Sequence, residues 1–204
     1  MARDFLSEVY YLDTDQQRHD LYSEWAESYD ADLTAHGYVT PQRCAQAAAR
    51  FVHDRSRPVL DVGCGTGISG KALAAAGFSN IFGMDVNREM LAKAKELGIY
   101  RNLSVSEPGA PLLFEPGTYE LIAAIGVIGT GAAPIDFLHE CLSLLASGNL
   151  MVFSFNDHTL AEPEYMKAVE DRLGSGEFRM LHEEYGPHIS KLDMCSTVFV
   201  MQRT

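Results

Sequence analysis

The stretch from Val59 to Gly70 constrains the fold more than any other part of the chain. It begins with the short apolar run Val59–Val62, which is typical of a buried strand. Glycines stand at positions 63, 65 and 67, and apolar residues then recur at helical spacing as far as Gly77, where a helix is expected to stop. Because glycines let the backbone bend and approach a ligand, and a helix start offers free N–H groups, the stretch predicts a nucleotide-type ligand site.

Strands and helices alternate along most of the remaining sequence. We expect strands at 59–62, 81–85, 103–105, 119–125 and 150–155, and helices at 42–53, 68–76, 87–97, 134–145 and 163–173. The segments 178–181 and 196–201 are expected to form a closing antiparallel hairpin with a long loop. This order predicts an α/β fold with a doubly wound, mostly parallel seven-stranded sheet and an antiparallel last strand. Ligands of such sheets lie beyond the carboxyl ends of the strands.

Length and composition predict one domain over residues 1–204 of the chain. Of the 204 residues, 47% are hydrophobic, which is enough for a full core. Residues 1–40 are rich in aromatic and charged side chains and are expected to form an N-terminal helical segment, with the core at 41–204. Leu21, Trp25 and Tyr29 fall on one face of a helix there, which fits either packing on the core edge or a lid over a ligand.

Charge and cysteine usage restrict the partners and the compartment. The net charge of -12 disfavours nucleic acid and membrane surfaces. Cys44, Cys64, Cys141 and Cys195 are scattered, which argues against a metal site or disulfides and fits a reducing cytoplasm. The charged N-terminus, with Arg3, Asp4 and Glu8, is not that of a signal peptide, and the longest apolar run, Leu121–Gly129, is too short to span a bilayer.

Two cofactors compete for the glycines. Gly65–Gly70 is a literal G-x-G-x-x-G, and Asp85 follows at the end of the next strand, about 20 residues on, as in nicotinamide-dependent oxidoreductases. The first strand ends near Val62, however, so the first glycine of the turn is Gly63. In that frame the motif is Asp61-x-Gly-x-Gly-x-Gly.

The second frame resembles the first motif of class I S-adenosylmethionine-dependent methyltransferases. Residues 83–91, Gly-Met-Asp-Val-Asn-Arg-Glu-Met-Leu, resemble the second motif, and residues 144–150 resemble the helix-to-strand turn of that family. The front of the chain, with Tyr22, Trp25, Tyr29-Asp30 and Gly37-Tyr38, resembles the branch that contains the methyltransferase-like protein of the Williams–Beuren syndrome region and its bacterial relatives. The resemblance covers about residues 20 to 155.

The resemblance implies a Rossmann-like methyltransferase fold, S-adenosyl-L-methionine as cofactor and a set of cofactor-binding residues. Asp61 is then expected near the ammonium group, Asp85 at both ribose hydroxyls, and Val86 at the adenine. The full set is Trp25, Tyr29, Asp61, Gly63, Cys64, Gly65, Gly67, Asp85, Val86, Met90, Glu107 and Ile125. Trp25 and Tyr29 are expected on the sulfonium side, because aromatic faces attract cations.

The sequence departs from the family at two places. Many relatives carry Gly-Asp after the third strand, where this chain has Ser106-Glu107, so either residue is a candidate for the adenine contact. Many relatives also carry a histidine soon after the fourth strand, and this chain has the glycine-rich segment 126–131 there instead.

We therefore expect a methyltransferase that acts on a small-molecule acceptor, neutral or cationic given the acidic charge. An activated methyl group needs alignment and exclusion of water, and a base only if the nucleophile must lose a proton. The catalytic residues stay unassigned, with weak candidates for a base in Tyr38, Asp157, His158 and His188. Two alternatives remain open at this point, an NAD(P)-dependent oxidoreductase and a catalytically silent relative that acts through protein partners.

Overall fold

The computed structural model describes residues 5–12 and 14–204. Residues 1–4 and 13, which belong to the predicted N-terminal segment and include Arg3 and Asp4, lie outside the described part. Seven strands form one sheet in the order β3-β2-β1-β4-β5-β7-β6. They are β1 Val59–Val62, β2 Ile81–Asp85, β3 Tyr100–Val105, β4 Leu121–Ala124, β5 Leu150–Asn156, β6 Phe178–Ile189 and β7 Met194–Arg203. Neighbouring strands from β3 to β5 are parallel and β7 is antiparallel to both of its neighbours, which confirms the predicted sheet.

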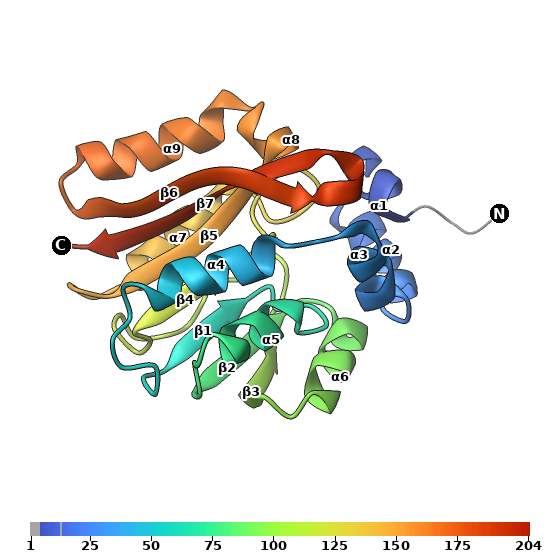
Figure 1. Cartoon of the computed structure of the whole chain (residues 1–204), viewed down its shortest axis with the longest axis horizontal. Helices are drawn as coiled ribbons and strands as arrows, with labels where there is room; N and C mark the ends of the chain where they lie inside the picture. The colour runs from blue at the N-terminus through green and yellow to red at the C-terminus, as the bar shows by residue number, and fades with distance from the viewer. Residues whose placement is uncertain (1–4, 13) are drawn as a thin grey trace.

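Helices cover both faces of the sheet (Figure 1). The core helices are α4 Thr40–Ala49, α5 Ile68–Ala75, α6 Arg88–Glu96, α7 Ile135–Ser143 and α9 Pro163–Gly174. In β4, Leu121 and Ala123 pack in one apolar cluster with α4 and α5, while Ile122 and Ala124 pack in the other with α7 and α9. A strand buried on both faces has no polar side to present, which explains the continuous apolar runs at β1 and β4.

The closing hairpin differs from the prediction. β6 runs on to Ile189, so Tyr185–His188 belongs to a strand and not to a long loop. The connection to β7 is only the short 3-10 helix η2, Ser190–Leu192. Gly186 and Pro187 suggest a loop in the sequence, but β6 is the edge strand of the sheet, where a proline costs no ladder hydrogen bond. The strand therefore carries His188 to the carboxyl end of the sheet.

The N-terminal segment is grouped at one end of the sheet (Figure 1). It consists of α1 Phe5–Glu8, η1 Val9–Tyr11, α2 Asp15–Trp25 and α3 Tyr29–His36. Val9, Leu21, Trp25 and Leu33 form an apolar cluster with Ile189 at the end of β6. We call α1, η1, α2 and α3 the lid.

Ion pairs and a hydrogen bond connect the lid to α5 and α6. Lys71 Nζ lies 2.9 Å from Asp30 Oδ2, and Lys93 Nζ lies 2.8 Å from Glu27 Oε1. Asn87, which caps α6, donates from its side chain to Ser23 Oγ over 2.8 Å. The lid therefore closes over the carboxyl ends of β1 and β2.

Candidate cofactor and acceptor site

The three glycines after β1 have different structural roles. Gly63, Gly65 and Gly67 have φ angles of 63°, 53° and 92°, in the left-handed region that favours glycine. A Cβ at Gly63 would lie 2.1 Å from Val127 Cγ2, and one at Gly67 would lie 2.5 Å from Leu97 Cδ1. A Cβ at Gly65 would meet nothing within 4 Å. The outer two glycines are therefore needed for packing, while the middle one leaves open backbone for a ligand.

Asp61 at the core of β1 has one satisfied and one unsatisfied carboxylate oxygen. The residue is fully buried, and its Oδ2 accepts hydrogen bonds of 2.7 Å from both Ser69 Oγ and Tyr100 Oη. Its Oδ1 is buried without a hydrogen-bond partner. Burial raises the pKa of Asp61 to about 7. A buried, unpartnered oxygen of this kind is expected to bind a donor, and the ammonium group of an amino-acid ligand suits it.

Asp85 at the end of β2 links the glycine turn to α6. Its Oδ2 accepts from the Gly65 N–H and its Oδ1 from the Asn87 N–H, both over 2.8 Å. Burial raises the pKa of Asp85, and the backbone hydrogen bonds oppose that rise. Each carboxylate oxygen keeps further lone pairs, so the group can still accept from two ribose hydroxyls. Val86 beside it is 40% exposed, which leaves an apolar surface for a ring.

Other predicted cofactor residues are more deeply placed. Met90 is 2% exposed, and its N–H donates to the Asn87 side chain over 2.9 Å. Cys64 is buried and donates from its N–H to Met84 O, and Ile125 packs in the apolar cluster on the α4 and α5 face. Met90, Cys64 and Ile125 are thus buried beneath the proposed cofactor site and support it by packing.

Ser106 and Glu107 are the two candidates for the adenine contact, and they differ in position and burial. The Ser106 N–H donates to Asp85 O over 3.0 Å, and the residue is half-buried. Glu107 is exposed. Ser106 therefore lies against the proposed ribose residue, and Glu107 lies further out.

Gly70 fits both glycine frames, and Gly63 distinguishes them. A Cβ there would lie 2.1 Å from Tyr100 Oη, so this glycine makes room for a side chain of the protein. In the dinucleotide frame, the third glycine likewise serves close packing, but the first two would be Gly65 and Gly67. Here the turn already begins at Gly63, whose missing side chain makes room for Val127.

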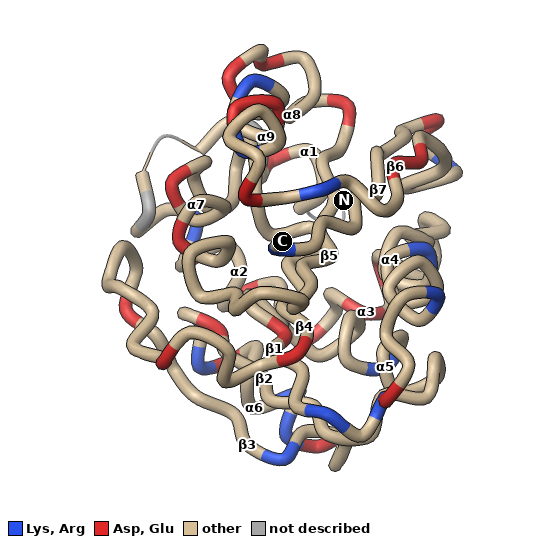
Figure 2. The backbone as a smooth tube through the Cα atoms, turned by 90° about the vertical axis from the view of Figure 1, so that its left-hand side faces the viewer, with Lys and Arg blue, Asp and Glu red and all other residues tan. Residues whose placement is uncertain are grey.

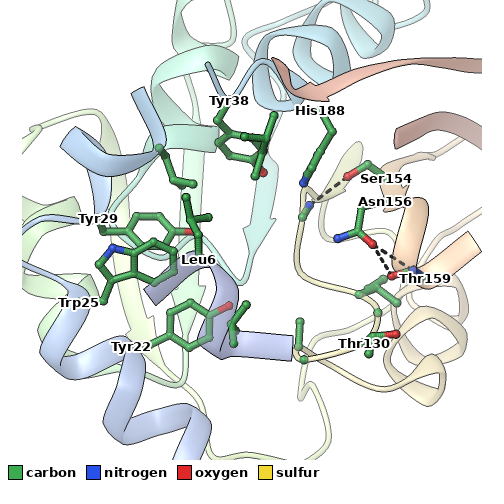
Figure 3. A pocket seen from close by; sticks show the side chains of 18 residues that line it. Leu6, Tyr22, Trp25, Tyr29, Tyr38, Thr130, Ser154, Asn156, Thr159 and His188 are labelled. Carbon is green, nitrogen blue, oxygen red and sulfur yellow. Dashed lines mark hydrogen bonds between the residues drawn. The ribbon is translucent and has the colours of Figure 1, made fainter. Parts of the chain in front are cut away.

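A cavity of about 70 Å³ lies under the lid at the carboxyl ends of β4, β5 and β6 (Figure 3). Its lining contains no Asp, Glu, Lys or Arg among the described residues. The lid contributes aromatic side chains, and the sheet side contributes glycines and neutral polar groups. The lining residues are Leu6, Val9, Tyr22, Trp25, Tyr29, Leu33, Tyr38, Gly126, Ile128, Gly129, Thr130, Gly131, Ala132, Ser154, Asn156, Thr159, His188 and Ile189.

Trp25 and Tyr29 both lie on this cavity, as expected for a lid. Their ring centroids are 4.6 Å apart in an edge-to-face arrangement, and Trp25 Nε1 donates to Asp32 Oδ2 over 2.8 Å. Trp25 is 2% exposed, so it also packs as a core residue of the lid. Trp25 thus packs on the core of this segment and also lines the cavity, while its contact with a ligand stays a prediction.

The structure brings two of the four base candidates to the cavity. Tyr38 and His188 line it, with ring centroids 5.2 Å apart. Asp157 does not line it, and its oxygens accept from Tyr185 Oη over 2.9 Å and from the Cys195 N–H over 2.7 Å. His158 is exposed and also lies off the lining. Both begin the short helix α8, Asp157–Leu160, which turns their side chains away from the cavity edge.

Sequence reasoning missed the polar groups on the sheet side. Ser154 in β5 accepts from the Gly126 N–H over 3.1 Å, and Asn156 at the end of β5 accepts from Thr159 N over 3.0 Å. The position of Asn156 at a strand's carboxyl end is a usable signal, because ligands of parallel sheets lie there. Thr159 lies in the short helix α8 and Thr130 in a turn, and the sequence pattern predicts neither.

Comparison with known proteins identifies the family. A family model described as a methyltransferase domain matches residues 36–192. The chain belongs to this methyltransferase family. The match agrees with the resemblance to class I enzymes, whose cofactor is S-adenosylmethionine, and it favours the Gly63 frame over the nicotinamide alternative.

Relatives and solved structures agree with this assignment. Methyltransferase-like protein 27 of Homo sapiens is 31% identical over 162 residues, which cover 77% of this chain and 66% of that protein. A ubiquinone biosynthesis O-methyltransferase of Colwellia psychrerythraea is 31% identical over 100 residues, covering 47% of this chain and 40% of that protein. The chain thus spans two thirds or less of these relatives.

The fold matches a TehB-like S-adenosylmethionine-dependent methyltransferase from Corynebacterium glutamicum. That structure has a TM-score of 0.60 and 16% identity and covers 89% of this chain and 98% of its own. The [4+2]-cyclase SpnF also reaches a TM-score of 0.60, at 16% identity and 80% coverage of both chains. These likenesses establish the fold.

Residues 5–12 and 14–204 contain no metal-binding cluster and no membrane-spanning helix. No group of three or more His, Cys, Asp or Glu side chains in this part is placed to hold a metal ion. No helix there is long and apolar enough to cross a membrane. The described Lys and Arg residues are interspersed with Asp and Glu around the molecule (Figure 2).

Proposed function

We propose that this methyltransferase transfers the methyl group of S-adenosylmethionine to a small, uncharged acceptor that occupies the cavity under the lid. The observation that supports this most is the lining, which combines aromatic rings with neutral polar groups and contains no charged side chain among the described residues. A charged acceptor would be desolvated there without an ionic partner, at a cost of several kcal/mol. The proposal therefore narrows the neutral or cationic acceptor expected from net charge to a neutral one.

The names of relatives support a small-molecule acceptor. The ubiquinone biosynthesis O-methyltransferases match between 47% and 56% of this chain, a stretch that covers at most half of those proteins. Their names describe O-methylation in the synthesis of a small molecule. Substrate identity does not follow from such partial matches, so the acceptor of this chain is inferred from the cavity itself.

The proposed cofactor contacts follow from the carboxylate oxygen that lacks a hydrogen-bond partner and from the backbone that has open space beside it. Asp61 Oδ1 holds the ammonium group, Asp85 accepts from the ribose hydroxyls, and Gly65 allows close approach of the ligand. Val86 lies under the adenine, with Ser106 and Glu107 at its edge. Bound S-adenosylmethionine supplies a methyl group that is already activated, so these residues need only hold and orient it.

The lid excludes water from the reacting atoms. Trp25 and Tyr29 turn aromatic surface toward the place where the sulfonium is expected, and an aromatic face attracts a cation. The cavity volume of about 70 Å³ is smaller than the roughly 300–1,000 Å³ typical of ligand pockets. Ligand entry therefore requires the lid to move away from α5 and α6, and closure then seals the site.

Thermal unfolding with S-adenosylhomocysteine and with NADH tests the cofactor part of the proposal. We expect a clear rise in melting temperature with S-adenosylhomocysteine and none with NADH, because a ligand stabilises the folded state that binds it. Stabilisation by NADH alone contradicts the proposal. A methyl-transfer assay over a panel of neutral and charged small molecules tests the acceptor part. Cofactor binding without turnover of any compound would favour the silent relative that acts through partners.

A further inference from the structure

A buried chain of hydroxyl groups leads to the His188 side chain. Thr40 and Ser196 are fully buried, and His188 is 6% exposed. Thr40 Oγ1 lies 2.8 Å from His188 Nδ1 and 2.9 Å from Ser196 Oγ. The three residues come from α4, β6 and β7, so the rigid core fixes the imidazole. With Nδ1 held by Thr40, the opposite edge of the ring points from β6 toward the cavity (Figure 3).

Arg43 sets the direction of the hydrogen bonds in this chain. Its Nη1 donates to Ser196 Oγ over 3.1 Å and to Pro187 O over 2.8 Å. A guanidinium only donates, so Ser196 Oγ accepts there and has its own proton to give. Among the described residues, the hydroxyl oxygen within reach of that proton is Thr40 Oγ1. The arrangement that gives both hydroxyl protons a partner has Thr40 accepting from Ser196 and donating to His188 Nδ1, and the inference below takes this direction.

The surroundings of His188 keep the imidazole neutral. Burial lowers the pKa of His188 to about 4, Asp157 opposes this shift, and Arg43 and His158 add to it. A neutral imidazole carries one proton, and Nδ1 is occupied as an acceptor. The proton is therefore on Nε2, the nitrogen on the cavity side.

We infer that His188 presents its Nε2–H to the cavity as a fixed hydrogen-bond donor, and that the acceptor molecule carries a neutral oxygen that takes this bond. The inference rests on the proposed function and names the substrate class of that site: a small neutral molecule with a carbonyl, ether or hydroxyl oxygen next to the methylated atom. His188 is then a positioning residue that recognises oxygen. It does not take a proton from the nucleophile, since a protonated Nε2 has no free lone pair.

Long-range proton–nitrogen NMR on the nitrogen-labelled full chain at pH 7 tests the tautomer directly. The spectrum of His188→Gln assigns the signals of His188. We expect the Nε2–H tautomer in the wild type, both free and with S-adenosylhomocysteine bound. A predominant Nδ1–H tautomer, or a charged ring, overturns the inference. Calorimetry with S-adenosylhomocysteine on the same sample reports separately on the proposed function, so the two failures are distinguishable.

Thr40→Val tests whether the hydroxyl chain sets the tautomer. The variant keeps the shape of the side chain and removes the donor to Nδ1, so a mixture of both tautomers is expected. An unchanged, pure Nε2–H tautomer in this variant would show that the chain from Arg43 plays no part. Should the variant fail to fold, as judged by its amide spectrum, the wild-type spectrum alone still decides.

Two ligands of the same shape test the preference for oxygen. Acetophenone and α-methylstyrene differ in a carbonyl oxygen against a methylene group, and their binding to the full chain loaded with S-adenosylhomocysteine is measured by saturation-transfer NMR. One hydrogen bond predicts about fivefold tighter binding of acetophenone, and loss of that preference in His188→Leu. Equal affinities in the wild type overturn the assignment of an oxygen-bearing acceptor.

Discussion

The proposed cofactor half and the proposed acceptor half of this site are built in different ways. The cofactor half spans β1, α5, β2 and α6, and its key groups, Asp61, Gly65 and Asp85, lie within one short stretch of sequence. The acceptor cavity takes its lining from the lid, the segment after β4, the end of β5 and the end of β6. A site formed by one short stretch of sequence can be predicted from a motif. A site assembled from distant segments becomes visible only when the folded structure is known.

The two halves also differ in charge. Two carboxylates with raised pKa values, the buried Asp61 and the half-buried Asp85, dominate the proposed cofactor half, which suits a ligand with an ammonium group and hydroxyls. The acceptor cavity has no charged lining side chain in the described part of the chain, and its polar contacts are neutral. This contrast separates the substitutions that should affect cofactor binding from those that should affect turnover.

The largest expected effect is that of Asp85→Ala on cofactor binding. The substitution removes both ribose contacts and the acceptor of the Gly65 N–H, so affinity for S-adenosylhomocysteine should fall at least about 100-fold. Glu170→Ala is the control, since Glu170 is an exposed carboxylate on α9 outside the proposed cofactor site, and it should change affinity less than about threefold. Calorimetry measures both. Near-normal binding by Asp85→Ala would mean that the ribose lies elsewhere.

The second prediction separates turnover from cofactor binding at His188. His188→Leu removes the proposed Nε2–H donor and leaves the Thr40 hydroxyl without its partner at Nδ1. For the best neutral acceptor of the panel, kcat/KM should therefore fall about 30-fold. His188→Gln keeps an N–H donor near the same place and should lose less than about tenfold. Affinity for S-adenosylhomocysteine should stay within about twofold in both. Equal inactivation of the two variants would point to a base instead of a donor.

The third prediction concerns Asp61 and pH. Its folded pKa of about 7 lies above its unfolded value of 3.8, so the folded state binds the proton more tightly and wild-type stability falls as pH rises through that window. Asp61→Asn does not titrate, so its stability relative to the wild type should improve by about 2–4 kcal/mol between pH 4 and pH 8.

Urea unfolding of the ligand-free Asp61→Asn and wild-type proteins at several pH values measures this difference. The same variant should lose affinity for S-adenosylhomocysteine, because an amide cannot pair with an ammonium group as a carboxylate does. A pH-independent difference in stability would show that Asp61 does not titrate in this range. Tyr100→Phe offers a milder change, since it removes one hydrogen bond to Asp61 Oδ2 and leaves the carboxylate in place.

The smallest expected effect is that of loosening the lid. Asp30→Asn weakens the contact with Lys71, which is a partly exposed ion pair, so the melting temperature should change little. Easier opening should raise the release rate of S-adenosylhomocysteine about two- to fivefold in stopped-flow fluorescence of Trp25. An unchanged release rate would show that the contact between Asp30 and Lys71 does not hold the lid closed.

The contrast between the halves also explains what the sequence could predict. The strands β1 and β2 and the α6 cap at Asn87 follow from apolar runs, glycines and capping residues, all of which act locally. The end of β6 was mispredicted because Gly186-Pro187 is a loop signal that edge pairing with β7 overrides. Asp157 was proposed at the cavity from its place after β5, and a helical turn directs it to Tyr185 instead.

No local sequence pattern predicts the hydrogen-bonded hydroxyl groups that lead to His188. Thr40 is a common first-turn residue of a helix, and Ser196 is an ordinary strand residue. Their connection appears only when α4 packs beside β6 and β7, with 148 and 156 residues between the hydrogen-bonded partners. Sequence reasoning named His188 as a candidate base, and the structure supplies the context that makes it a donor.

A crystal structure of the chain with S-adenosylhomocysteine tests most directly whether the two halves meet at the sulfur atom. The account predicts the amino group at Asp61 Oδ1, the ribose at Asp85, and the sulfur at the edge of the cavity beside Tyr29, facing the His188 imidazole across it. A cofactor whose sulfur points away from this cavity, or whose ribose does not contact Asp85, would contradict the account.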